Sequence, residues 1–271
     1  MSEPDGLYEA QANRLEIDSQ KSTAPLADDE FYDMRHRNRG IALIFNHLIF
    51  DQMLCKPRRG TDHDRDNMEN VLKMMGFHVK IYNDYTCDQI METLDIVSKM
   101  DHSNNDCLVV TILSHGGRFG TIYATDRPYN SNDVIHKFSG TQCPSLAGKP
   151  KLFFIQACRG EQADSGVRIH SDSPRRDQEF YTIPNLADIL IMFSTVEGYY
   201  AWRDTQNGSW FIQSLCKMLR KHYKTREFLS ILTLVNRDVA IGYESDSILP
   251  KFHKKKQMCC IASMLTRLLR F

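Results

Sequence analysis

The stretch FFIQACRG at residues 153–160 takes the chain from an apolar run to a reactive side chain. Residues 152–155 are continuously apolar, which is typical of a short strand buried on both faces. Cys158 lies just past this run, and Arg159 and Gly160 follow it directly. A cysteine that only packs belongs inside such a run. Cys158 is therefore either a packing residue at a strand end or a thiol placed at a sheet edge for chemistry.

Strands and helices alternate on both sides of this stretch. Further apolar or alternating runs predict strands at residues 40–46, 77–82, 108–113, 189–193 and 259–265. Apolar residues at helical spacing predict helices at residues 61–75, 86–100, 210–222 and 226–239. This alternation predicts an α/β fold with a largely parallel sheet covered on both faces. Such sheets bind ligands beyond the carboxyl ends of their strands, where His115 and Cys158 both lie.

The composition excludes several classes of partner and site. The 271 residues include 34 basic and 34 acidic side chains, so charge gives no argument for nucleic acid or an anionic membrane as partner. The basic run at residues 253–256 is interpreted as a solvated loop. No apolar run has a membrane-spanning length, and the polar N-terminus lacks the core of a secretory signal. The eight cysteines show neither a disulfide framework nor a zinc cluster, so we expect a reduced, cytoplasmic protein without metal or cofactor.

Two polar segments interrupt the pattern. Residues 16–30 are small, polar and acidic without any period, which is typical of a flexible tail. Residues 160–184 are polar, rich in Ser and Asp, and aperiodic. A loop of this length within a compact domain is unusual, and such loops are often functional or disordered.

His115 and Cys158 together can form a nucleophilic pair. A thiol needs a base or a positive neighbour to react at neutral pH, and a histidine can take its proton and later give it to a leaving amine. Gly116 has no side chain, so the backbone after His115 can approach a substrate closely. The backbone N–H groups of Gly116 and Cys158 can then hold a developing oxyanion. A single histidine or cysteine at a strand end is more often a surface or packing residue. The string QACRG at residues 156–160 is far more specific.

Five short motifs in order carry a family resemblance: RRGTD at 58–62, LSHG at 113–116, QACRG at 156–160, GYYAWR at 198–203 and GSWF at 208–211. With these motifs the chain resembles an executioner (effector) caspase from about residue 39 to residue 271. The resemblance implies a three-layer sandwich with a mostly parallel six-stranded sheet. It also implies a thiol protease that cuts after aspartate and acts in apoptosis.

The resemblance assigns the catalytic residues. It makes Cys158 the nucleophile and His115 the acid–base residue, with the backbone N–H groups of Gly116 and Cys158 as the oxyanion hole. The backbone carbonyl near Lys56 is expected to orient the histidine in place of an Asn or Asp side chain.

The resemblance also assigns the substrate pockets. Arg58, Gln156 and Arg203 are expected to line the primary pocket, and arginine suits an aspartate because its planar fork bonds a carboxylate bidentately. A pocket of this kind should reject asparagine, which would leave buried cations without a partner. The aromatic residues expected in the outer pockets are Tyr200, Trp202 and Phe252 at the second pocket and Trp210 at the fourth; taken singly, they would be assigned to core packing.

Asp204 departs from the family pattern. Several executioner caspases carry asparagine at this place and use it to hold an aspartate four residues upstream of the cut. An aspartate here would repel that substrate residue. We therefore expect Leu, Ile or Val to be tolerated at the fourth substrate position.

Activation by cutting follows from the same resemblance. Asp172 is the favoured cut site in the linker at 160–184, and Asp18 is favoured in the tail; Asp164, Asp177, Asp28 and Asp29 are further candidates. The expected parts are a prodomain at 1–18, or as far as 29, a large subunit at 19–172 and a small subunit at 173–271. They would assemble as a dimer of heterodimers joined by the last strand at 257–265. The expected partners are protein substrates, an upstream initiator caspase and inhibitor-of-apoptosis-type proteins.

Three other interpretations remain open. A non-catalytic homologue acting as a decoy would be expected to lose the nucleophile, the histidine or a pocket arginine, all of which are present. A related enzyme that cuts after arginine or lysine would need acidic residues where Arg58 and Arg203 stand. A redox sensor would need a resolving cysteine near Cys158, and none is close in the sequence.

Overall fold

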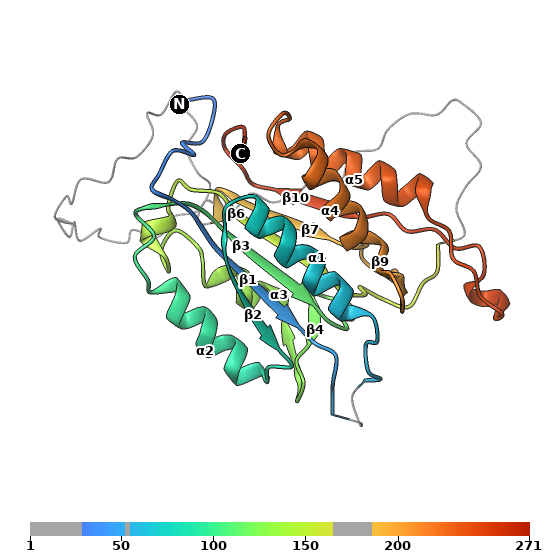
Figure 1. Cartoon of the computed structure of the whole chain (residues 1–271). Coiled ribbons are helices and arrows are strands. Elements are labelled where there is room, and N and C mark those ends of the chain that lie inside the picture. Colours follow the sequence, from blue (N-terminus) through green and yellow to red (C-terminus); the bar gives the residue numbers. More distant parts are fainter. Residues whose placement is uncertain (1–28, 52–54, 165–185) are drawn as a thin grey trace, which may run out of the picture.

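A computed structural model describes residues 29–51, 55–164 and 186–271 (Figure 1). Its centre is a six-stranded sheet in the order β10-β7-β6-β3-β1-β2. The strands are β1 (Asn38–Asn46), β2 (His78–Asn83), β3 (Asn105–Leu113), β6 (Lys151–Gln156), β7 (Ile189–Phe193) and β10 (Cys260–Ser263). All neighbouring strands are parallel except β10, which pairs antiparallel with β7. The predicted, mostly parallel six-stranded sheet is therefore confirmed.

Helices cover both faces of this sheet and make three layers (Figure 1). The helices are α1 (Thr61–Met74), α2 (Cys87–Ser98), α3 (Ser131–His136), α4 (Trp210–His222) and α5 (Phe228–Gly242). Alternate strand residues face opposite sides. One set, which includes Ala42, Val109 and Phe154, packs with α1, α4 and α5. The other set, which includes Leu43 and Val110, packs with α2 and α3.

Short elements stand beyond the ends of the central strands. They are β4 (Thr121–Tyr123), β5 (Pro128–Asn130), β8 (Arg203–Asp204), β9 (Gly208–Ser209) and the 3₁₀ turns η1 (Pro144–Leu146) and η3 (Pro250–Phe252). β4 pairs with β5 and β8 pairs with β9, both antiparallel. The sequence did not predict them or α3, because segments of two to six residues are too short to show a period.

Several predicted boundaries differ from the structure by one to three residues, as at α5 and β10. Helix α5 begins at Phe228 rather than at 226, because the side chain of Glu227 accepts a hydrogen bond from Ser230 N (3.0 Å) and caps the helix. Strand β10 is four residues long, shorter than the predicted 259–265. In the part of the chain that the structure describes, no helix has the length and apolar character to cross a membrane.

Candidate active site

The two expected catalytic residues lie side by side because of the sheet register. β3 and β6 are parallel neighbours, and Leu113 stands opposite Gln156 at their carboxyl ends. His115 and Cys158 each follow two residues after this pair, so both emerge at the same edge of the sheet. The expectation that these two strand tips share an edge is confirmed.

Gly116 lets the two strand ends touch. A Cβ atom on this residue would lie 2.4 Å from Cys158 O and 2.8 Å from Ala157 Cβ, so only glycine fits without a shift of the backbone. Within the described residues, neither Gly116 N nor Cys158 N donates a backbone hydrogen bond. Two backbone donors at one sheet edge are the kind of group that stabilises an oxyanion.

The imidazole of His115 is fixed from two sides. Its Nε2 lies 2.8 Å from Lys56 O, and the ring of Phe50 packs against it with centroids 5.0 Å apart. The contact with the carbonyl near Lys56 is confirmed, and because a carbonyl oxygen only accepts, Nε2 carries the proton and Nδ1 is left to act as a base. Sequence reasoning missed Phe50, which no motif marks.

The side chains of His115 and Cys158 are both uncharged at neutral pH. Burial, with smaller contributions from Arg58 and Arg203, lowers the pKa of His115 to about 4. Burial also raises the pKa of the Cys158 thiol, although the Ala201 N–H and the two arginines oppose this. A thiol and an unprotonated imidazole therefore predominate at neutral pH, so the proton must move when a substrate is attacked.

The Cys158 thiol is held by the loop after β7. Ala201 N donates a hydrogen bond to Cys158 Sγ (3.4 Å), and no hydrogen bond joins Sγ to His115 among the described residues. The loops after β6 and β7 are tied together, since Arg159 N donates to Tyr199 O and Gly198 N donates to Arg159 O. Gly160, the last residue of QACRG, must be glycine, because a Cβ on it would lie 2.3 Å from the carbonyl group of Gly198.

Arg58 is fully buried and only half bonded. Its Nη1 donates to His47 O (3.1 Å) and Thr61 Oγ1 (2.7 Å), whereas Nε and Nη2 have no partner in the described part of the chain. Burial, followed by repulsion from Arg203, lowers the pKa of Arg58 to about 9, so the side chain still carries its charge at neutral pH. Nε and Nη2 form one edge of the guanidinium fork, the edge that a carboxylate bonds bidentately.

The other two expected pocket residues are near the same edge. Arg203 is half-buried and its Nε donates to Arg59 O (3.0 Å). Gln156 is buried at the end of β6, and its Oε1 has no partner among the described residues. Asp64 was not predicted to belong here. It is buried and acts electrostatically on both Arg58 and Arg203, while its Oδ1 accepts from Ser209 N (2.7 Å).

A groove of about 510 Å³ holds the expected aromatic residues. Its lining includes Tyr200, Trp202, Arg203, Asp204, Trp210 and Phe252. The Phe252 ring stands edge-on to the rings of Tyr200 and Trp202, at 5.7 and 6.0 Å, and Trp202 stacks on Trp210 at 5.9 Å. Sequence reasoning missed Glu244, Asp246 and Ser247, which line the same groove from the polar segment after α5.

Asp204 sits in this groove as an ionised acceptor. Its Oδ1 accepts hydrogen bonds from Gln206 N (2.6 Å) and Asn207 N (3.0 Å), and these bonds lower the pKa of its carboxyl. The side chain is exposed and has no proton to donate. It can therefore repel, but not hold, an acidic substrate residue.

Most expected cut sites lie outside the described residues. These are Asp18, Asp28, Asp172 and Asp177. Asp164 is described, and its backbone carbonyl accepts from Lys256 N (2.9 Å) in a β-bridge. Asp29 is exposed, and its carbonyl accepts from Arg267 Nε (3.1 Å).

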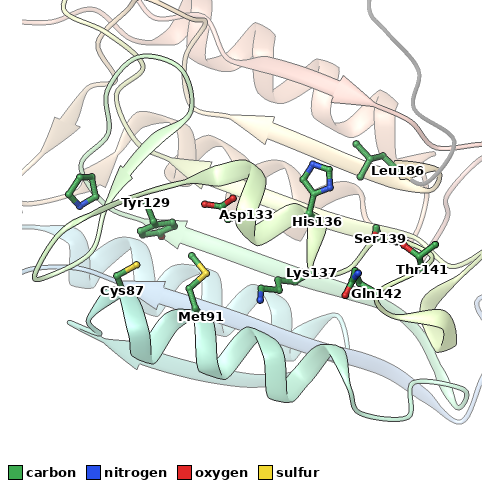
Figure 2. A pocket seen from close by; sticks show the side chains of 11 residues that line it. Cys87, Met91, Tyr129, Asp133, His136, Lys137, Ser139, Thr141, Gln142 and Leu186 are labelled. Carbon is green, nitrogen blue, oxygen red and sulfur yellow. Dashed lines mark hydrogen bonds between the residues drawn. The ribbon is translucent and has the colours of Figure 1, made fainter.

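Another cavity, of about 770 Å³, lies between α2 and the segment around α3 (Figure 2). Figure 2 shows Cys87 and Met91 from α2 below it and Tyr129, Asp133 and His136 above. None of the expected catalytic or pocket residues lines it. Among the described residues, no three His, Cys, Asp or Glu side chains are grouped as a metal site.

Comparisons with known proteins agree with this geometry. The family model described as "Caspase domain" matches residues 39–270. Caspase drICE of Drosophila melanogaster is 45% identical over 93% of this chain and 76% of its own length. Caspase-3 of Bos taurus is 44% identical, over 90% of this chain and 88% of its own. The crystal structure of caspase-1 from Spodoptera frugiperda has a TM-score of 0.83 at 43% identity and covers 95% of this chain and 98% of that one. The chain therefore belongs to the caspase family and is a cysteine endopeptidase of the executioner type, which cleaves after aspartate in apoptosis.

Proposed function

We propose that Cys158 is the nucleophile and His115 the general base and acid of this endopeptidase. As Sγ of Cys158 attacks the scissile carbonyl, His115 takes the thiol proton, and the oxyanion is held by the N–H groups of Gly116 and Cys158. His115 then gives the proton to the leaving amine and a thioester remains. Water, deprotonated by the histidine, attacks this thioester and releases the acid, and the thiol is restored.

Selection of aspartate rests on Arg58, Arg203 and Gln156. The observation that carries this proposal is the buried edge of Arg58, whose Nε and Nη2 have no partner in the described part of the chain. A substrate carboxylate would offset part of the positive charge of Arg58 and Arg203 and pair these donors at once. Asparagine brings no charge and would leave the cations uncompensated, so it should be rejected.

The outer pockets would be filled by the residues upstream of the cut. Tyr200, Trp202 and Phe252 form an aromatic cluster that suits an apolar side chain at the second position. Trp210 and Asp204 would face the fourth position, where an ionised acceptor disfavours aspartate and tolerates Leu, Ile or Val. A Val-Glu-Ile-Asp reporter should therefore be cut better than an Asp-Glu-Val-Asp reporter, and equal or reversed rates would exclude this preference.

The chain would be made as a zymogen and cut in the linker at 160–184. We favour Asp172, with Asp177 as a further candidate, and an upstream initiator caspase as the activating enzyme. Asp164 is a weaker site, because a peptide bond to be cut must enter the groove extended and the Asp164 carbonyl is already paired with Lys256. Asp18, or Asp28 or Asp29, would release the tail. The products would be subunits 19–172 and 173–271.

Assembly into a dimer of heterodimers would use β10, which is an edge strand with β7 on one side. An open strand edge presents N–H and C=O groups that a second copy can pair with. We place the protein in the cytoplasm, with inhibitor-of-apoptosis-type proteins as regulatory partners.

The test uses purified protein and its Cys158→Ala variant with two reporters, Val-Glu-Ile-Asp and Val-Glu-Ile-Asn. Reporter release and chain fragmentation are followed together. We expect release from the aspartate peptide alone, its loss in the variant, and fragments that end at Asp172. No release from either peptide after deliberate cutting of 160–184 would overturn the catalytic assignment.

A further inference from the structure

A basic groove lies between α4 and α5. These two helices cover one face of the sheet (Figure 1). The groove has a volume of about 420 Å³. Four basic side chains line it: Lys221, His222, Arg226 and Arg237. Lys221, Arg226 and Arg237 are exposed, and none of the three has a salt bridge within the described residues. Partial burial and the repulsion of Arg226 and Lys221 lower the pKa of His222, as expected where positive charge is in excess.

The single acid of the groove does not offset this charge. Asp238 Oδ1 accepts from Lys217 Nζ (2.7 Å) and its Oδ2 accepts from Ser214 Oγ (2.9 Å). Apolar side chains complete the lining, and Ile241 among them is 72% exposed. The groove thus combines unneutralised cations with apolar surface, which suits a segment that carries both acidic and apolar residues.

The N-terminal tail of this chain has that composition. Residues 1–28 carry six acidic side chains and two basic ones. The acids are Glu3, Asp5, Glu9, Glu16, Asp18 and Asp28. The motif LEID at 15–18 alternates apolar and acidic residues. Residues 165–185, in contrast, carry three acidic and three basic side chains, so charge favours the tail over this segment as occupant.

The tail also joins the fold beside the groove. Leu268 N donates to Glu30 O (2.8 Å), and Phe228 N, at the start of α5, donates to Leu269 O (2.8 Å). Residues 29–30 therefore lie next to the helix end that follows Arg226. Residues 18–29 can extend about 35 Å, whereas the 15 residues of α5 span about 22 Å, so the tail can reach along the whole groove.

We propose that the tail at residues 1–28 docks in the basic groove formed by Lys221, His222, Arg226 and Arg237. Its covalent attachment makes the contact intramolecular, so that individually weak ion pairs suffice to hold it. A cut at Asp18 would remove five of the six acids and end the attachment of the released peptide. The role of that cut rests on the proposed function, whereas the docking itself does not.

The test uses the full chain with Cys158→Ala, which keeps it uncut, and a zero-length carbodiimide that joins carboxylates to lysine amines. Mass spectrometry should find tail carboxylates joined to Lys221 within one chain. The double variant Arg226→Glu, Arg237→Glu should lower this yield at least about fivefold, and 1 M salt should lower it as well. The matched variant Lys80→Glu, Lys99→Glu, on β2 and after α2, should leave it unchanged.

Further outcomes decide against the docking. The docking would be overturned if tail carboxylates were joined equally to Lys99 or to a second copy of the chain. It would also be overturned if the charge reversal at Arg226 and Arg237 left the cross-link yield at Lys221 unchanged. Residues 165–185 joined to Lys221 in place of the tail would overturn it as well. The assay has no catalytic readout, so its failure would leave the proposed protease activity untouched.

Discussion

Arg58 is a charged side chain that the fold buries completely. Burying a cation is costly unless its donors are paired, and the protein pairs only those on Nη1. A substrate aspartate would pair the remaining donors. Ligands without a carboxylate would leave the buried charge unpaired, so the site would select aspartate. In the proposed role of Arg58, its unpaired buried donors are the physical reason for aspartate specificity.

Arg58→Lys should lower kcat/KM for the aspartate reporter by at least about 100-fold. Lysine keeps the charge but loses the planar fork, and hydrogen bonds between charged groups contribute on the order of 1.5–3 kcal/mol each. The matched control is Arg59→Lys, which makes the same change at an exposed neighbour and should have little effect. A rate for Arg58→Lys within about threefold of the parent would contradict the role of the fork.

His47 makes the folding stability of the protein depend on pH. It is fully buried, its Nε2 lies 3.1 Å from Tyr85 O, and burial lowers its pKa to about 4. The unfolded chain binds a proton near pH 6.5 and the folded chain does not, so stability is lost as the pH falls through that range. The loss from this one group is about 2 kcal/mol between pH 7.5 and 5.

Urea unfolding of the Cys158→Ala protein at both pH values checks this, with His47→Gln as the second variant. Glutamine keeps an N–H for Tyr85 O but does not titrate. The free energy of unfolding should therefore fall by about 2 kcal/mol less between pH 7.5 and 5 when glutamine is present. An equal fall in both proteins would show that His47 is not the group that titrates.

Site residues that follow a periodic strand can be predicted from the sequence, whereas those in short or polar segments cannot. The six central strands are continuous or alternating runs, and the positions of His115 and Cys158 follow from where two of them end. Asp246 and Phe50 lie in polar or short segments without a period, so nothing local marks them as groove or histidine contacts. Burial of Arg58 is equally invisible, because it depends on contacts made across the fold.

The short strands β8 and β9 hold Asp204 in the groove that we propose to bind substrate. Asp204→Asn should keep the turn, since asparagine Oδ1 can still accept from Gln206 N and Asn207 N. It removes the negative charge and adds a donor, so the rate ratio of Asp-Glu-Val-Asp to Val-Glu-Ile-Asp reporters should rise about fivefold to tenfold. Asp246→Asn makes the same change elsewhere in the groove and should alter the ratio less. An unchanged ratio in Asp204→Asn would mean that this side chain does not face the fourth substrate residue.

At the scale of the whole molecule, the sheet has two edges, β2 and β10. β10 is short and is the one antiparallel strand of the described sheet, and Met264 N, just past its end, donates to Ile189 O (2.8 Å). Backbone N–H groups alternate between the two sides of a strand. Ala262 N therefore points to β7, and Ser263 N points to the open edge where a second copy would pair.

Two proline variants of β10 separate dimerisation from folding. Ser263→Pro removes an N–H from the open edge, so sedimentation should show a dimer Kd that is at least about tenfold higher, with a nearly unchanged unfolding midpoint. Ala262→Pro removes an N–H that pairs with β7, so it should lower the unfolding midpoint itself. Both are measured in the full chain with Cys158→Ala. Ser263→Pro could leave the dimer intact while Ala262→Pro destabilises the fold. The outward N–H groups of β10 would then contribute nothing to assembly, and the second copy would not bind along this strand.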